Sequence, residues 1–171
     1  MVVILYSLLW HLLTSFYSLS FQNVDGEVVN MNNFQGKKVL IVNIATGSDK
    51  IDQLGGLQLL QQQFTDSLVV IVFPSNSFGH ETRNNSEIKQ FCQSNYNSTF
   101  IIASKSSVIG SGIHPVFEWL SKKSENGEMN APAGADFQKF LIDKDGMLMG
   151  VFSSKISPTD SSIIQAVNIS Y

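Results

Sequence analysis

Two kinds of apolar pattern alternate along this chain. Continuous apolar runs at residues 39–44 and 68–73 are typical of strands that are buried on both faces of a sheet. After each run, apolar residues fall at helical spacing, which predicts helices over residues 51–64 and 85–95. Strands that alternate with helices in this way indicate an α/β layer structure.

The flanking segments add shorter elements. Residues 19–24 alternate apolar and polar side chains, and a turn at Asp25-Gly26 leads into residues 27–31, which together predict an N-terminal β-hairpin. The remaining expected elements are a strand at 100–103, a helix at 115–123, a hairpin of 137–142 with 147–152, and a last helix that opens at Pro158 and ends near residue 167. Ser48 or Asp49 is the expected N-cap of the helix at 51–64.

Length and composition indicate one globular domain. The chain has 171 residues, of which 43% are hydrophobic, so it can bury a sizeable core. With a net charge of −3 and only 15% charged residues, it carries no basic stripe for nucleic acid. One cysteine, Cys92, excludes an intrachain disulfide, and the three scattered histidines lack metal-ligand spacing. We therefore expect neither a metal nor another cofactor.

The first residues differ from the rest of the chain. Residues 1–14 form an apolar extension before the domain, which we place at residues 15–171. The extension is short of the about 20 apolar residues that span a bilayer, and it lacks the positive n-region of an export signal. It is either a degenerate signal segment, which would make the protein exported or periplasmic rather than cytoplasmic, or an extra element packed on the domain. In the first case, removing residues 1–13 should leave folding intact.

The segment at residues 42–48 reads V-N-I-A-T-G-S and joins a buried strand to a helix. It resembles the active-site turn of the glutathione peroxidase family, V-N-V-A-S-K-C-G. Four further blocks resemble that family in order and with nearly its spacing: F-P-S-N-S-F-G at 73–79, S-E-I-K-Q-F-C at 86–92, H-P-V-F-E-W-L at 114–120 and F-Q-K-F-L-I-D-K-D-G at 137–146. The resemblance covers residues 17–167. It implies a thioredoxin-like fold with a central mixed sheet flanked by helices.

The same resemblance implies a peroxide-reducing site whose residues are missing here. Ser48 stands where the family places its reactive cysteine, and a serine oxygen cannot cycle through a sulfenic acid. The family glutamine belongs to a G-x-Q-E string after the block at 73–79, but here the chain reaches Glu81 one residue early. The tryptophan and asparagine positions hold Ala135 and Asp136. All four members of the family tetrad are therefore absent.

Two other chemistries can be considered for these positions. Glu81 and Asp136 place carboxylates near the expected pocket, where they would raise the pKa of a thiol or act as an acid/base pair, but both lie on predicted loops and are expected to be solvated. Ser48 with His80 or His114 resembles a nucleophile with its base, yet no G-x-S-x-G elbow is present. A capping serine and a structural role for His114 are the simpler expectations.

Cys92 is the one residue with thiol redox chemistry. It lies on the apolar stripe of the helix at 85–95, where a cysteine is a small buried hydrophobe. Two hypotheses therefore stand at this point: a catalytically degenerate member of a peroxidase family that responds to oxidative stress, or a residual thiol peroxidase that acts through Cys92. A thiol reductant, glutathione or thioredoxin, is a partner by resemblance only, and neither nucleic acid nor a membrane is expected.

Overall fold

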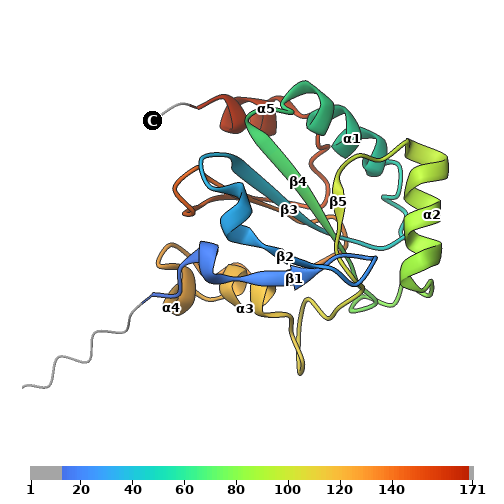
Figure 1. Cartoon of the computed structure of the whole chain (residues 1–171), viewed down its shortest axis with the longest axis horizontal. Coiled ribbons are helices and arrows are strands. Elements are labelled where there is room, and N and C mark those ends of the chain that lie inside the picture. The colour runs from blue at the N-terminus through green and yellow to red at the C-terminus, as the bar shows by residue number, and fades with distance from the viewer. Residues whose placement is uncertain (1–12, 170–171) are drawn as a thin grey trace, which may run out of the picture.

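A computed structural model describes residues 13–169 of the chain (Figure 1). Its centre is a five-stranded mixed sheet with the order β5-β4-β3-β6-β7. Strand β3 runs parallel to β4 and antiparallel to β6, and β6 and β7 form the predicted hairpin. The strands are β3 (Lys38–Ile44), β4 (Leu68–Pro74), β5 (Ile101–Ile102), β6 (Lys139–Ile142) and β7 (Leu148–Phe152), with β1 (Ser20–Gln22) and β2 (Val28–Asn30) in a separate antiparallel pair.

Strand β3 is central, as its apolar run predicts. Every one of its residues is buried, because both faces of the sheet are covered. Val39 and Ile41 point into one core, whereas Leu40, Val42 and Ile44 point into the other. The alternation of side chains along a strand divides a continuous apolar run between two layers.

Helices cover both faces of the sheet (Figure 1). One face carries α1 (Gln53–Gln63), α2 (Asn85–Tyr96) and α5 (Ser161–Asn168). The other face carries α3 (Pro115–Ser121), the short α4 (Lys123–Asn126) and the β1–β2 hairpin, with 3₁₀ turns at Phe16–Ser18 and Met31–Phe34. The two faces therefore enclose two cores, one on each side of the sheet.

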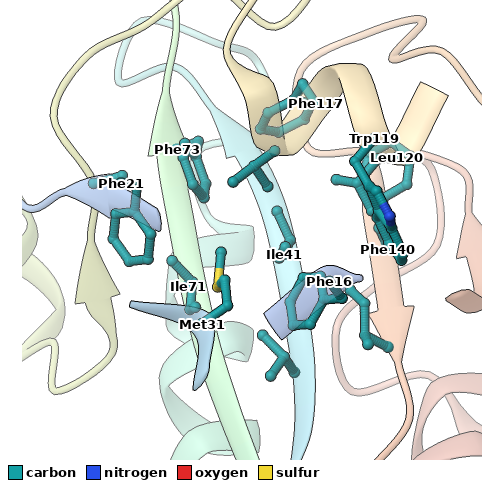
Figure 2. Close-up of a cluster of buried hydrophobic side chains, with 14 of the residues drawn as sticks. Phe16, Phe21, Met31, Ile41, Ile71, Phe73, Phe117, Trp119, Leu120 and Phe140 are labelled. Atoms are coloured by element: carbon teal, nitrogen blue, oxygen red, sulfur yellow. The ribbon is translucent and has the colours of Figure 1, made fainter. Parts of the chain in front are cut away.

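Aromatic residues dominate the core beneath α3 and the hairpin (Figure 2). The ring of Phe73 on β4 packs against Phe21 from β1 and Phe117 from α3, with centroids 5.2 and 5.3 Å apart. Phe117 also meets Phe140 of β6 edge to face. These contacts join the hairpin and α3 to the sheet with the tilted and edge geometries that aromatic pairs prefer.

Two helices begin later than predicted, and the helix predicted at 115–123 ends at Ser121. Helix α1 begins at Gln53, after a series of turns, and the side chain of its N-cap residue Asp52 makes no capping bond, so neither Ser48 nor Asp49 caps it. Helix α5 begins at Ser161 rather than near Pro158, because the Asp160 side chain accepts from the Ser162 N–H at 2.8 Å and sets the first turn there. In both cases the helix was predicted to start at the first residue of a turn, but the chain makes further turns before the helix begins.

The start of the described chain is held against α3 and α4. The Trp119 Nε1–H donates to the Thr14 carbonyl at 2.7 Å, and the Thr14 hydroxyl donates to Glu125 at 2.9 Å. Leu13 lies against Gly127, where an added Cβ would be 2.9 Å from a Leu13 methyl carbon. The predicted extension at 1–14 otherwise lies outside the described residues, and its separation from the domain stays a prediction. No described helix has the length and apolar character needed to cross a bilayer.

A buried lysine ties the last helix to the central strand. Lys38 is 8% exposed, and its Nζ donates to the carbonyls of Ala166, Val167 and Ile169 at 2.9, 2.9 and 2.6 Å. These carbonyls belong to the end of α5, where helical carbonyls lack partners and a cation is favourable. Burial lowers the pKa of Lys38, but the three carbonyls give the ammonium group its hydrogen bonds.

We expect Lys38→Met to lower the free energy of unfolding by about 1–3 kcal/mol, because it leaves three acceptors at the end of α5 without their donor. Lys37→Met is the matched control, since the Lys37 ammonium makes only a 3.5 Å contact with the Thr65 carbonyl. Urea denaturation of the three proteins gives the comparison. Equal losses in both variants would show that the Lys38 contacts contribute no specific stability.

Candidate functional site

The candidate site lies at the carboxyl end of β3. The turn that follows this strand meets two loops: residues 79–83, after β4, and residues 135–137, before β6. Each loop is hydrogen-bonded to the end of β3 or to its turn, and the structure brings together all four predicted site positions, Ser48, Glu81, Ala135 and Asp136, around this end.

Glu81 is buried and joins two loops by hydrogen bonds, whereas the sequence-based expectation was a solvated loop residue. Its carboxylate is 1% exposed and accepts from the Thr46 N–H and the Thr46 hydroxyl, both at 2.7 Å, and from the Arg83 N–H at 3.1 Å. Arg83 also donates to the Thr46 hydroxyl at 2.6 Å and stacks over the Phe91 ring. With its oxygens committed to these donors, Glu81 joins the two loops and is not placed as a proton donor or acceptor for a substrate.

Gly47 allows the loop at 79–83 to approach the turn closely. The Gly47 N–H donates to the His80 carbonyl at 3.0 Å, and a Cβ at position 47 would lie 2.6 Å from that oxygen. A side chain at this position would therefore push the loops apart.

The loop at 135–137 is held in a strained conformation. Phe137 has φ +65°, a left-handed value that a bulky residue adopts only when its surroundings impose it. Asn43 of β3 accepts from the Phe137 N–H at 2.6 Å and donates its side-chain amide to the Ala135 carbonyl at 2.9 Å. Lys139, which is fully buried, donates to the Phe137 carbonyl at 2.7 Å. These bonds fix the residue between them, Asp136.

Asp136 is buried and paired with His80, which is the second correction to the solvated expectation. The carboxylate is 3% exposed, and its Oδ2 lies 2.6 Å from His80 Nδ1. Its other oxygen, Oδ1, is buried and has no hydrogen-bond partner among the described residues. A buried acceptor without a donor costs about 1–3 kcal/mol, and among the described side chains with such an atom Asp136 is the one of acidic type.

Ser48 lies in the turn between β3 and α1. It is 5% exposed, and its hydroxyl accepts from the Lys50 N–H at 3.3 Å and lies 3.4 Å from an Asp49 oxygen. Both contacts are long. Asp49 itself pairs with Lys50 at 2.7 Å, and hydrogen bonding to that ammonium is the main reason that the pKa of Asp49 is lowered.

The other candidates lie apart from this group. His114 caps α3 by accepting from the Val116 N–H at 3.2 Å, which is the structural role expected for it, and burial lowers its pKa. Cys92 on α2 is fully buried in the core with Leu57 and Ile88, as predicted, and burial raises the pKa of its thiol to about 12. Among residues 13–169, no three His, Cys, Asp or Glu side chains converge as metal ligands.

Comparison with known proteins assigns the fold and the family. The fold is thioredoxin-like: the crystal structure of Trgpx in its apo form superposes with a TM-score of 0.68 at 28% identity, over 91% of this chain and 97% of that one. A thioredoxin-family thiol:disulfide interchange protein from Chlorobium tepidum has the same fold at 16% identity, with a TM-score of 0.61 over 92% and 98%.

Sequence relatives define the family more narrowly. The model of the glutathione peroxidase family matches residues 16–121. A glutathione peroxidase of Lactococcus lactis is 36% identical over 85% of this chain and 94% of its own length. The glutathione peroxidase-like peroxiredoxin GPX5 of Chlamydomonas reinhardtii is 39% identical over 84% and 89%. The chain therefore belongs to the glutathione peroxidase family.

Sequence reasoning considered His80 only as a possible base for Ser48 and did not pair it with Asp136. The structure directs His80, not Glu81, at Asp136. The supporting roles of Asn43 and Lys139 were also missed, because they depend on contacts across the sheet.

We expect the free energy of unfolding to show a lysine-dependent rise between about pH 8 and 10.5. Burial lowers the pKa of Lys139 from 10.5 to about 8, so in this range the unfolded chain binds more protons than the folded one, and raising the pH favours folding. Lys139→Met should lack this contribution, so the difference between variant and wild type should change by about 1–3 kcal/mol across the range. Denaturant titrations at several pH values measure it. Parallel pH profiles would contradict the low pKa.

Proposed function

We propose that this chain is a member of the glutathione peroxidase family that has lost peroxide reduction while keeping the fold. The main observation behind the proposal is that the chain has no accessible thiol. Ser48 takes the place of the reactive cysteine, and the one thiol of the chain, Cys92, is fully buried with a pKa raised to about 12. Peroxide reduction by a thiol requires an accessible thiolate, because the thiolate is the nucleophile.

The surroundings of residue 48 support the same conclusion. Ala135 and Asp136 hold the positions of the family tryptophan and asparagine, so two side-chain N–H donors are replaced by a methyl group and a carboxylate. Donors of this kind stabilise developing negative charge, whereas a carboxylate disfavours it. Glutathione or thioredoxin would then find no sulfenic acid or disulfide to reduce, and the family's thiol partner would have no turnover role here.

The alternative, a residual thiol peroxidase that acts through Cys92, requires this thiol to reach solvent. Helix α2 directs Cys92 into the core beside Ile88, and the carboxylate of Glu81 adds to burial in raising the pKa of the thiol. No path for peroxide to Cys92 is evident from these contacts. We therefore favour the degenerate member, a conclusion that two measurements address separately.

The first measurement is alkylation of Cys92. We expect iodoacetamide to label it at least about a hundredfold more slowly in the native protein than in guanidinium chloride at the same pH, because the native thiol is buried and protonated. Mass spectrometry of timed samples gives both rates. Hydrogen peroxide with dimedone should leave no sulfenic acid adduct on Cys92. Native labelling at the denatured rate would restore the alternative.

The second measurement is turnover. The wild type should show no peroxide-dependent NADPH consumption when coupled through glutathione reductase or thioredoxin reductase. Ser48→Cys alone should restore little turnover, because it supplies sulfur without the side-chain N–H donors. The triple variant with Ser48→Cys, Ala135→Trp and Asp136→Asn should turn over about a hundredfold or more faster than Ser48→Cys alone. Wild-type turnover that survives Cys92→Ala would contradict the proposal and indicate another centre.

A further inference from the structure

The His80–Asp136 pair has the arrangement of a base and the residue that orients it. Asp136 Oδ2 lies 2.6 Å from His80 Nδ1, and the His80 side chain is 53% exposed, so the ring reaches solvent with Nε2 unpaired among the described residues. A carboxylate that accepts from Nδ1–H selects the tautomer in which Nε2 carries the lone pair. The pair is therefore set to accept a proton at Nε2.

Two further observations indicate that the pair is built and not incidental. Asp136 is held by the strained Phe137, whose N–H and carbonyl are bonded to Asn43 and Lys139. Asp136 Oδ1 is buried without a partner, although an exposed aspartate in a loop would satisfy both oxygens with water. Strain and an unsatisfied buried carboxylate are features that accumulate at functional sites.

A nucleophile lies next to this pair. The Gly47 N–H bonds the His80 carbonyl, which places Ser48, the next residue, beside the His80 loop. The Ser48 hydroxyl does not cap α1 and is held only by contacts of 3.3 and 3.4 Å, so little binds it in its present position. The N–H of Asp49, directly after Ser48, has no hydrogen-bond partner among the described residues and can donate to an oxyanion.

From this arrangement we propose that Ser48, His80 and Asp136 form a nucleophilic site that hydrolyses small carboxylic esters. Ser48 Oγ attacks the acyl carbon while its proton passes to His80 Nε2. The bond to the leaving alcohol then breaks, and the alcohol oxygen takes that proton. Water attacks the acyl-serine with His80 again accepting the proton, which releases the acid and restores Ser48. The net reaction is ester plus water to acid plus alcohol.

The substrate class follows from the small residues beside the nucleophile. Gly47 precedes Ser48, Ala135 precedes Asp136, and Gly79 precedes His80, with no atom within 4 Å of a Cβ added at Gly79. None of these residues supplies a charge to hold a charged acyl group, and the charged residues that follow Ser48, Asp49 and Lys50, pair with each other at 2.7 Å. Short, neutral acyl esters are therefore the expected class, with p-nitrophenyl acetate as the probe.

The experiment uses the full chain and a fluorophosphonate probe, with the labelled residue located by mass spectrometry. We expect labelling at Ser48, with p-nitrophenyl acetate hydrolysis above the buffer rate. Ser48→Ala should abolish both, and His80→Gln, which removes the proposed base, should lower both at least about tenfold, as should Asp136→Asn. Ser94→Ala, on the exposed side of α2, is the matched control and should leave both unchanged. Thermal melting confirms that each variant is folded.

A second readout separates a base from a merely structural histidine. In Ser48→Cys, iodoacetamide labelling at residue 48 against pH reports the pKa of the new thiol. We expect a thiol that reacts at neutral pH in Ser48→Cys and at least about tenfold more slowly when His80→Gln is added. Absence of fluorophosphonate labelling at Ser48, or equal thiol profiles with and without His80, would overturn the proposal. Neither result bears on peroxide turnover, which is measured separately.

Discussion

The hydrogen bonds at the carboxyl end of β3 are the constraint on which the candidate site depends. Asn43 binds the loop at 135–137 through both its backbone and its side chain, and the turn after Ile44 binds the loop at 79–83 through Thr46 and Gly47. Because β3 is buried on both faces, its carboxyl end is a rigid attachment point for the two loops. Segments about ninety residues apart in sequence meet there, as ligand-binding and catalytic groups do at the carboxyl ends of strands in other open α/β sheets.

The two buried carboxylates at this end of β3 differ in their hydrogen bonding. Glu81 has hydrogen-bond donors for both of its oxygens and joins two loops. Asp136 has one partner and one oxygen without a hydrogen bond. Lys139 is fully buried, and burial lowers the pKa of its ammonium group to about 8. A fully bonded carboxylate rigidifies a site, but a partly bonded one retains the capacity to interact with something further. The difference between the two carboxylates is why we assign a structural role to one and a chemical role to the other.

Family membership and chemistry diverge in this protein. The fold and the relatives place the chain in the glutathione peroxidase family, whereas we propose that its site, with Ser48 and no accessible thiol, no longer reduces peroxide. A fold preserves the positions at which side chains meet, and the reaction follows from which side chains occupy them. The serine, histidine and aspartate that we propose as the site of this chain are groups suited to proton transfer and acyl transfer rather than to thiol redox chemistry.

The architecture and the serine at position 48 can be read from the sequence alone. The apolar run of β3 and the helical spacing of Leu54, Leu57 and Leu60 predict buried strands and covering helices because burial of apolar surface drives both. The identity of residue 48 is known from the sequence because folding cannot change a serine oxygen into a sulfur atom. The tertiary structure decided the rest: the burial of Glu81 and Asp136, the start of α1, and the pairing of His80 with Asp136. These depend on hydrogen bonds between segments distant in the chain, and local patterns carry no information about which distant donor will meet a given acceptor.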